Sequence, residues 1–448
     1  MPLKGNIDTQ MIDRFNKDYL KNQSRQVIKN SIIKNGLKAT TLNANAVRNM
    51  QHTFSEEIKT GKATSQKSSG RCWMFAGLNV FRQKISEELN IKDFELSQVY
   101  PMFWDKLEKS NYFLENIIAT VDEDIYSRLL MWLLADPIQD GGQWDMFANL
   151  ITKYGVVPQY AMPETFHSSS SYIMNRAITL KLREYASTLR QKHKDGSSLV
   201  DLKSMKMDML NEIYRMLVYF LGEPPTIFDF EYRNEDKEFH FERNLTPQEY
   251  FKKYVKLDLD NFVSVINAPT ADKPFNQTFT VQYLGNVIGG KDILYLNVEN
   301  DILKQLAVAQ LKDKKPVWFG CDVGKMLDTE NGIMEKDLYD YETAFETAFA
   351  LDKAARLDYR ESLLTHAMVF TGVNLVDDKP NRWKVENSWS DKSGKEGYYV
   401  MGDSWFDEYN YQIVIEKSYL PDELKQALEQ PPVVLPPWDP MGSLAMMQ

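Results

Sequence analysis

The chain has 448 residues, of which 43% are hydrophobic and 26% charged, an ordinary composition that suits two or three packed subdomains. Its formal net charge of −10 argues against nucleic acid as a partner, because binding nucleic acid requires a basic face. Its apolar runs are too short to span a membrane, and the first residues lack the apolar segment of a secretory signal. It has two cysteines, Cys72 and Cys321, fewer than a secreted chain of this size usually carries, so we expect a cytoplasmic protein with reduced thiols.

The first half of the chain is predicted to be mainly helical. Residues 1 to about 60 are polar with modest helical periodicity, and residues 72–92 place apolar side chains at helical spacing just after Ser-Ser-Gly. Residues 172–222 are also predicted to be helical, with a loop at residues 193–198. Residues 226–244 alternate apolar and polar side chains on both sides of a polar turn, which predicts a β-hairpin.

From about residue 315 the pattern changes to strands. The stretches "KPVWFGCDV", "THAMVFTGVNL", "NRWKVENSW" and "EGYYVM" are typical of strands, and residues 377–380 and 394–397 supply turns. A helical first half therefore precedes a strand-rich second half, which predicts an α+β fold.

A candidate nucleophile lies in residues 66–77, which read "QKSSGRCWMFAG". Cys72 is placed in the first turn of the predicted helix, where free backbone N–H groups and the helix dipole favour an anion and lower the pKa of a thiol. Gln66, six residues earlier, can donate its side-chain amide to the oxygen of a tetrahedral intermediate, with the Cys72 N–H as second donor. A cysteine before a helix is more often a small buried residue than a nucleophile. This motif alone therefore does not show that Cys72 is a nucleophile.

A thiolate nucleophile needs a partner that takes a proton and later returns it. Among five histidines, His366 is the one that begins a strand-like run followed by glycine. Asn387 can orient the imidazole. Trp389 can shield their hydrogen bond from water, and we also expect it to contact the substrate. The specific signal is the ordered combination of Gln-x5-Cys-Trp, His-Ala and Asn-Ser-Trp. Cys321 has no comparable helix start and is expected to be structural.

These motifs resemble those of papain-like cysteine peptidases. "QKSSGRCWMFAG", "THAMVFTG" and "ENSWSDKSGKEGYYVM" match the family segments that carry the oxyanion-hole glutamine, the nucleophile, the general base and its orienting asparagine. The resemblance implies these catalytic roles for Gln66, Cys72, His366 and Asn387. "DGGQW", at residues 140–144, is similar to the Gly-Gly strand whose backbone pairs with an extended substrate. Gly141 and Gly142 are therefore expected to bind substrate, although without the resemblance the stretch reads as a simple turn.

Within this family the chain is similar to the bleomycin hydrolase and aminopeptidase C branch over nearly its whole length, from "LKGNI" to "WDPMGSLA". The resemblance implies a cytoplasmic thiol aminopeptidase that acts on peptides with a free N-terminus, and it also suggests hydrolysis of bleomycin-like amides. It implies a ring-shaped homohexamer and no membrane partner, and we expect neither a metal nor a cofactor. The expected parts are an N-terminal segment (1–60), a helical half of the core (61–167), an inserted helical and hairpin subdomain (168–300), a β half (301–420) and a C-terminal arm (421–448).

The resemblance also implies that the apolar C-terminal arm lies in the active-site cleft. The terminal carboxylate of the family pairs there with the free amine of the substrate, which implies a substrate-binding role for Ala445, where the family pattern ends. This chain continues through Met446 to Gln448. Because the extra residues would displace the carboxylate, we predict that the enzyme trims its own tail.

Other functions stay open from the sequence alone. An oligoendopeptidase of the same branch would keep the same four catalytic residues. An acyltransferase would pass the acyl group to an amine instead of water. A catalytically inert papain-like scaffold would act only as a binding module, although such a protein has no need of the complete catalytic set.

Overall fold

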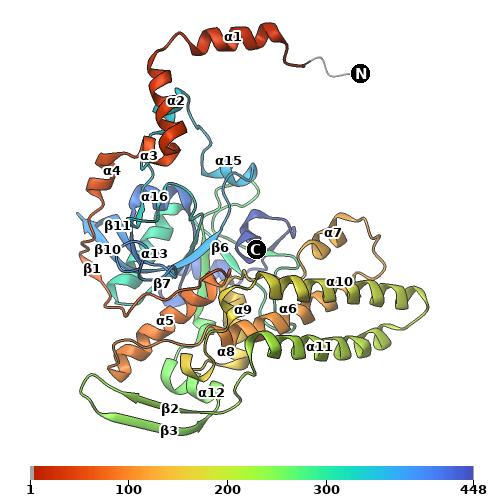
Figure 1. Ribbon diagram of the computed structural model, residues 1–448. Coiled ribbons are helices and arrows are strands. Elements are labelled where there is room, and N and C mark those ends of the chain that lie inside the picture. Colours follow the sequence, from red (N-terminus) through yellow and green to blue (C-terminus); the bar gives the residue numbers. More distant parts are fainter. Residues whose placement is uncertain (1–4, 447–448) are drawn as a thin grey trace.

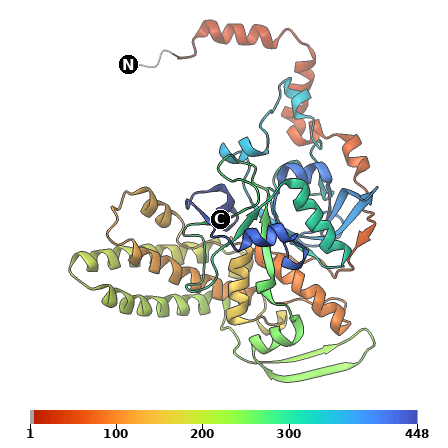
Figure 2. The same cartoon turned by 180° about the vertical axis from the view of Figure 1, so that it is seen from behind.

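Helices and a long mixed sheet form the two halves of the structure, a computed structural model that describes residues 5–446 (Figure 1). An N-terminal arm precedes both halves and projects from the body in both views (Figures 1 and 2). Its first two helices bury no residue against the body. The helices of the arm are α1 (Thr9–Tyr19), α2 (Ser24–Asn35), α3 (Leu37–Thr41) and α4 (Ala44–Asn49).

The helical half contains the predicted helix that begins at the candidate nucleophile. This helix, α5, is almost entirely buried over its first four turns and packs against the sheet. The predicted helices at 72–92 and 172–222 are confirmed, and so is the hairpin, formed by β2 (Phe228–Arg233) and β3 (Phe239–Leu245). The helices of this half are α5 (Cys72–Leu89), α6 (Val99–Ala119), α7 (Arg128–Ala135), α8 (Trp144–Tyr154), α9 (Phe166–Ser169), α10 (Tyr172–Lys194), α11 (Leu199–Leu221) and α12 (Pro247–Tyr250).

Local sequence explains the break between the two longest helices. Ser198 accepts a hydrogen bond from the backbone N–H of Asp201, whose carboxylate accepts in return from Ser198, so a capping box starts α11. Gly222, with φ of 84°, ends the same helix in a conformation that favours glycine. The loop between α10 and α11 is two residues shorter than expected, because α10 continues to Lys194.

The sheet of the second half has its strands in the order β14-β5-β6-β4-β13-β7-β10-β11-β12-β9-β8, with β1 paired to β10. The strands predicted after residue 315 are confirmed as β7, β10, β11 and β12. The sheet strands are β1 (Glu56–Glu57), β4 (Phe262–Ile266), β5 (Gln277–Val281), β6 (Tyr295–Asn297), β7 (Val317–Cys321), β8 (Leu327–Asp328), β9 (Ile333–Met334), β10 (His366–Val376), β11 (Lys379–Glu386), β12 (Tyr398–Gly402), β13 (Asn410–Glu416) and β14 (Val433–Leu435).

Three of these strands lie in the stretch that the sequence assigned to an inserted helical and hairpin subdomain. β4 pairs with β13, and β6 joins β4 to β5, so residues 262–297 extend the main sheet. The predicted boundary at residue 300 therefore does not coincide with a boundary in the sheet. These strands have only three to five residues each and are separated by turns, so their alternation was too brief to recognise.

Both faces of the sheet are covered, which gives two apolar cores. One core surrounds α5 and the helices behind it, while the other lies under α13 and α16 and contains Phe319, Phe370 and Trp383. The helices of this half are α13 (Asn300–Lys312), α14 (Tyr341–Phe345), α15 (Lys353–Asp358), α16 (Asp403–Tyr409) and α17 (Asp422–Leu428). Within residues 5–446, none of the helices combines the length and apolar character needed to cross a membrane.

Candidate active site

The start of α5 places Cys72 at the junction of the two halves. Cys72 is the first residue of the helix, and its side chain is 4% exposed. Backbone N–H groups of Ala367, Trp73 and Cys72 itself lie near the sulfur and act to lower the thiol pKa. Because Ala367 directly follows His366 at the start of β10, the sheet brings the general-base candidate to the thiol. The structure thus brings together two residues that lie far apart in the sequence.

The electrostatics of the thiol differ from the expectation drawn from the sequence. Burial raises the pKa of Cys72 to about 11, although the three backbone donors act in the opposite direction. Burial also lowers the pKa of His366 to about 4, against the opposing effect of its hydrogen bond to Asn387. The predicted lowering of the thiol pKa is therefore wrong for this structure, because a helix start stabilises the thiolate less than desolvation destabilises it.

Asn387 lies where it can orient the imidazole. The distance from His366 Nε2 to Asn387 Oδ1 is 2.8 Å, and both side chains are buried. Since Nε2 donates to Asn387, Nδ1 is the ring nitrogen left to exchange a proton with the thiol. The indole of Trp389 lies 4.8 Å from the imidazole, measured between ring centroids, and covers this hydrogen bond.

Gln66 is held beside the nucleophile by two contacts. Its Nε2 donates to the main-chain oxygen of Ser69 over 2.6 Å, and its Oε1 accepts from the hydroxyl of Ser388 over 2.7 Å. These partners fix which end of the amide is the donor and leave the second N–H of Nε2 for another acceptor. Ser388 is a positioning residue that sequence reasoning missed. The only feature of the sequence that pointed to Ser388 was its place in the Asn-Ser-Trp triplet, between Asn387 and Trp389.

A part-buried and a buried ion pair support the chain beside the reacting residues. Arg71, directly before the nucleophile, donates two hydrogen bonds of 2.9 Å each to the carboxylate of Glu164. Arg82 of α5 pairs with Glu386, the residue directly before the orienting asparagine. A site whose residues are held on such fixed supports needs little rearrangement to react.

The two candidate substrate-binding glycines have different surroundings. The carbonyl oxygen of Gly141 accepts from Lys109 Nζ over 2.6 Å, so a protein group already occupies it. Gly142 packs flat on the Trp73 indole, where an added Cβ would lie 2.4 Å from the ring. Within the described chain, no strand includes either glycine. Of the pair, Gly142 is the better placed to offer its backbone to a substrate.

The C-terminal arm reaches both walls of the site. The main-chain oxygen of Met441 accepts from Tyr295 over 3.1 Å and from Gln143, next to Gly142, over 3.4 Å. The Ser443 hydroxyl donates to the main-chain oxygen of Leu364, two residues before His366. Figures 1 and 2 both place this dark blue segment between the sheet and the helices.

The end of the arm is a short 3-10 helix, Pro440–Met446. Ala445 belongs to it, whereas Met447 and Gln448 lie outside the described residues, so the predicted trimming stays a prediction. Upstream, a buried ion pair of 2.8 Å joins Lys273 to Asp439 and holds the arm against the body. Strand β14 also pairs with β5, which fixes the start of the arm.

A thiol at a helix start, an Asn-oriented imidazole on the facing sheet and a fixed glutamine amide define a papain-like cysteine peptidase. The model of the Peptidase C1-like family matches residues 6–442. The chain belongs to this family, which confirms the predicted family, fold class and class of enzyme.

Individual relatives match along nearly the whole chain. Aminopeptidase C of Listeria monocytogenes is 52% identical over 444 residues, which cover 99% of this chain and 100% of that protein. Human bleomycin hydrolase is 41% identical over 409 residues, 89% of this chain and 90% of that protein. The crystal structure of PepW from Lactobacillus rhamnosis HN001 is similar with a TM-score of 0.97 and 51% identity, covering 98% of this chain and 99% of that one.

Proposed function

We propose that the protein is a thiol aminopeptidase that removes N-terminal residues from peptides through a Cys72 acyl-enzyme. The observation that carries the proposal is the placement of Cys72 at the start of α5 beside the His366–Asn387 pair. The relatives named aminopeptidase C, at 44–52% identity over nearly the full chain, support the same conclusion. The similarity to human bleomycin hydrolase supports hydrolysis of bleomycin-like amides as a further activity.

In the proposed reaction His366 takes the thiol proton on Nδ1, and the sulfur attacks the carbonyl carbon of the first peptide bond. The charge that develops on the carbonyl oxygen is stabilised by the free N–H of Gln66 and the backbone N–H of Cys72. His366 then returns its proton to the leaving amine, and water hydrolyses the thioester. Asn387 keeps the imidazole in the ring orientation and tautomer that these transfers require.

We infer that the C-terminal arm restricts the enzyme to free N-termini. Its contacts with Gln143 and with Leu364 support the inference, because a segment that touches both walls leaves no room for substrate residues before the first one. An oligoendopeptidase would need this part of the cleft to be open. The aminopeptidase is therefore the function that the geometry favours.

A panel of fluorogenic peptides tests the proposed function. We expect amino-acyl amides with a free amine to be hydrolysed, and their N-acetylated counterparts, matched in side chain, to be refused. Equal cleavage of both series would contradict the aminopeptidase and favour the oligoendopeptidase. Transfer of the acyl group to an added amine, without hydrolysis, would instead indicate an acyltransferase.

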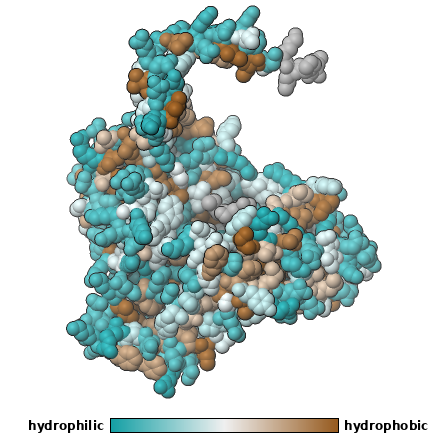
Figure 3. Space-filling view, in the orientation of Figure 1, coloured by the Kyte–Doolittle hydropathy of each residue, from teal (hydrophilic) through white to brown (hydrophobic). Residues whose placement is uncertain are grey.

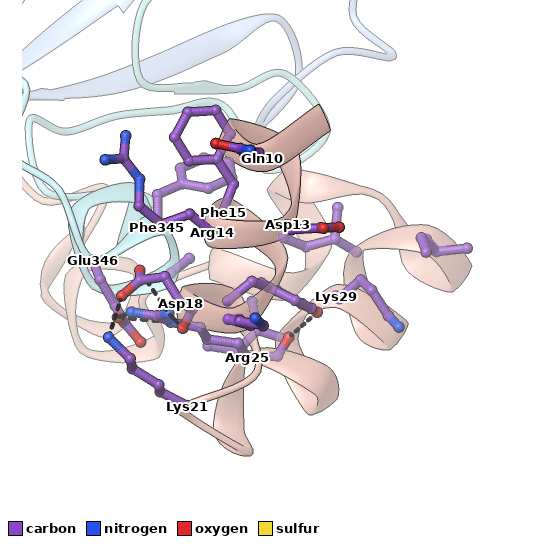
Figure 4. Close-up of a pocket in the computed structure, with 16 residues that line it drawn as sticks. Gln10, Asp13, Arg14, Phe15, Asp18, Lys21, Arg25, Lys29, Phe345 and Glu346 are labelled. Carbon is purple, nitrogen blue, oxygen red and sulfur yellow. Dashed lines mark hydrogen bonds and ion pairs between the residues drawn. The ribbon is translucent and has the colours of Figure 1, made fainter. Parts of the chain in front are cut away.

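We further propose a homohexamer. The N-terminal arm supports an assembly, because amphipathic helices that leave apolar side chains in water are usually covered by a partner. Figure 3 shows apolar groups along the projecting arm. A hollow of about 1150 Å³ lies where the arm meets Phe345, and Arg25 pairs with Glu346 beside it. Figure 4 shows the side chains that line this hollow. The exposed large apolar residues of the arm are Ile7, Ile12, Phe15, Leu20, Val27, Ile33 and Leu42.

Light scattering at working concentration tests the assembly. We expect about 313 kDa, six times the chain mass of 52.1 kDa, and a smaller mass after deletion of residues 1–35. A wild-type mass near 52 kDa would rule out the oligomer.

We also place the enzyme in the cytoplasm, a proposal that is supported by the free state of both cysteines.

A further inference from the structure

A buried cluster of charged side chains lies behind the two glycines of the cleft. Asp140 is 3% exposed, and its Oδ1 pairs with Nζ of the fully buried Lys106 over 2.6 Å. Asn175 donates to the same oxygen over 2.8 Å, and the Ser171 hydroxyl donates to Oδ2. Lys106 comes from α6, whereas the other two donors lie at the start of α10, so Asp140 links two separate segments.

Asp140 also contacts the chain on both sides of the nucleophile. The backbone N–H of Gly70, two residues before Cys72, donates to Asp140 Oδ2 over 2.9 Å. The indole N–H of Trp73, one residue after Cys72, donates to the main-chain oxygen of Asp140 over 2.6 Å. A Cβ added to Gly70 would lie 2.8 Å from the Cβ of Asp140, so the two segments touch with no spare room.

Two lysines of α6 fix the main chain around Asp140. Lys106 and Lys109 both donate to the main-chain oxygen of Gln139, over 2.7 and 2.9 Å, and Lys109 also donates to that of Gly141. Lys109 is in turn paired with Asp105 over 2.8 Å. The main-chain contacts of both neighbours therefore hold Asp140 in place beside the segment that leads to Cys72.

We propose that Asp140 is a positioning residue for the reaction: its carboxylate holds the loop from Gln66 to Cys72 in the geometry that binds the oxyanion. This inference rests on the proposed function, from which it takes the oxyanion role of Gln66. Both cysteines of the chain are free, so the link between the loop and the wall of the cleft is noncovalent.

The chemistry of the contacts requires a carboxylate at this position. All four groups that meet the side chain are donors, namely Gly70 N, Ser171 Oγ, Lys106 Nζ and Asn175 Nδ2. A carboxylate accepts all four, whereas an amide would turn its own N–H groups against two of them. Burial alone would raise the pKa of Asp140, but Lys106 and the other donors hold it well below its usual range, so the group stays charged.

Asp140→Asn separates positioning from a general structural role. We expect kcat for a free-amine substrate to fall about 10- to 100-fold, somewhat less than when an oxyanion donor itself is lost. Alkylation of Cys72 by iodoacetamide needs no oxyanion hole and should not slow down. The pKa of Cys72 is raised mainly by burial and also by the charge of Asp140, so removing that charge does not reduce the thiolate. Equal losses in hydrolysis and alkylation would indicate a merely structural role and overturn the proposal.

Asp403→Asn is the matched control. Asp403 accepts from the buried Lys304 over 2.7 Å and from the Trp383 indole over 3.1 Å, in the other core of the protein. This variant should lose thermal stability as Asp140→Asn does and keep its kcat. A similar fall of kcat in both variants would mean that lost stability, and not lost positioning, lowers the rate.

A variant that changes no charge keeps the proposal testable even if Asp140→Asn does not fold. Gly70→Ala inserts a methyl group between the loop and Asp140 without changing any charge, and should give the same split between hydrolysis and alkylation. Gln66→Ala should lower kcat about 10- to 1,000-fold, and adding Asp140→Asn to it should cost less than in the wild type. Normal kcat in Gly70→Ala and Asp140→Asn, with a low kcat in Gln66→Ala, would overturn the positioning role alone. Normal kcat in Gln66→Ala would contradict the oxyanion assignment itself.

Discussion

Cys72→Ala is expected to abolish peptide hydrolysis, with kcat lower by at least about 10⁴-fold, as is usual when a nucleophile is removed. The reason is that His366 has no bond-forming chemistry of its own and only moves the proton of the thiol. The variant should stay folded, because alanine is smaller than cysteine and the start of α5 is fixed by Arg71. Hydrolysis and thermal unfolding measured on the same preparation check both parts.

Cys321→Ala serves as the control for the loss of a buried thiol. Cys321 lies in β7 with no exposed surface, and burial raises its pKa well above the usual value. This variant should retain most of the activity, and iodoacetamide should label only Cys72 in the wild type. Hydrolysis that survives in Cys72→Ala, or preferential labelling of Cys321, would remove Cys72 from the proposed mechanism.

Deletion of Ser443–Gln448 should change the specificity of the enzyme rather than its chemistry. The segment contacts the wall that carries His366, so its removal opens the cleft before the first substrate residue. We expect N-acetylated peptides to be cut internally and the preference for a free amine to disappear. The peptide panel that tests the aminopeptidase measures both effects.

Ser443→Ala is a suitable control for this deletion, since it removes the hydrogen bond to Leu364 and keeps the length of the arm. It should preserve the refusal of N-acetylated peptides. If the truncated enzyme also refuses N-acetylated peptides, the arm is not what restricts cleavage to the first peptide bond. Intact masses of wild type and Cys72→Ala complete the comparison, since self-trimming would shorten only the active enzyme.

Long periodic segments were predictable from the sequence, and short ones were not. The helices α5, α10 and α11 and the strand β10 repeat their pattern over many residues, whereas β4 to β6 are brief and their pairing depends on β13, far along the chain. Propensity and periodicity describe local preferences, so they cannot reveal which distant segments share a sheet.

The four candidate catalytic residues could be proposed from the sequence because each chemical role demands a particular residue type, but their environment could not be predicted. Burial of Cys72 reverses the expected direction of its pKa, and burial arises only when the two halves meet. Ser388 and Asp140 stood inside motifs that had already been noticed, yet their roles depend on contacts with Gln66 and Gly70. Such contacts have no periodic signature in the sequence.

The ion pairs around the site have a consequence for oxidative stress. Arg71–Glu164, Arg82–Glu386 and Lys106–Asp140 brace the reacting residues without any sulfur–sulfur bond. A change in cellular redox potential therefore leaves the scaffold intact and acts on the reactive sulfur alone. Inactivation by peroxide at the sulfenic acid stage would then be a local and reversible event, which a small thiol repairs without refolding the protein.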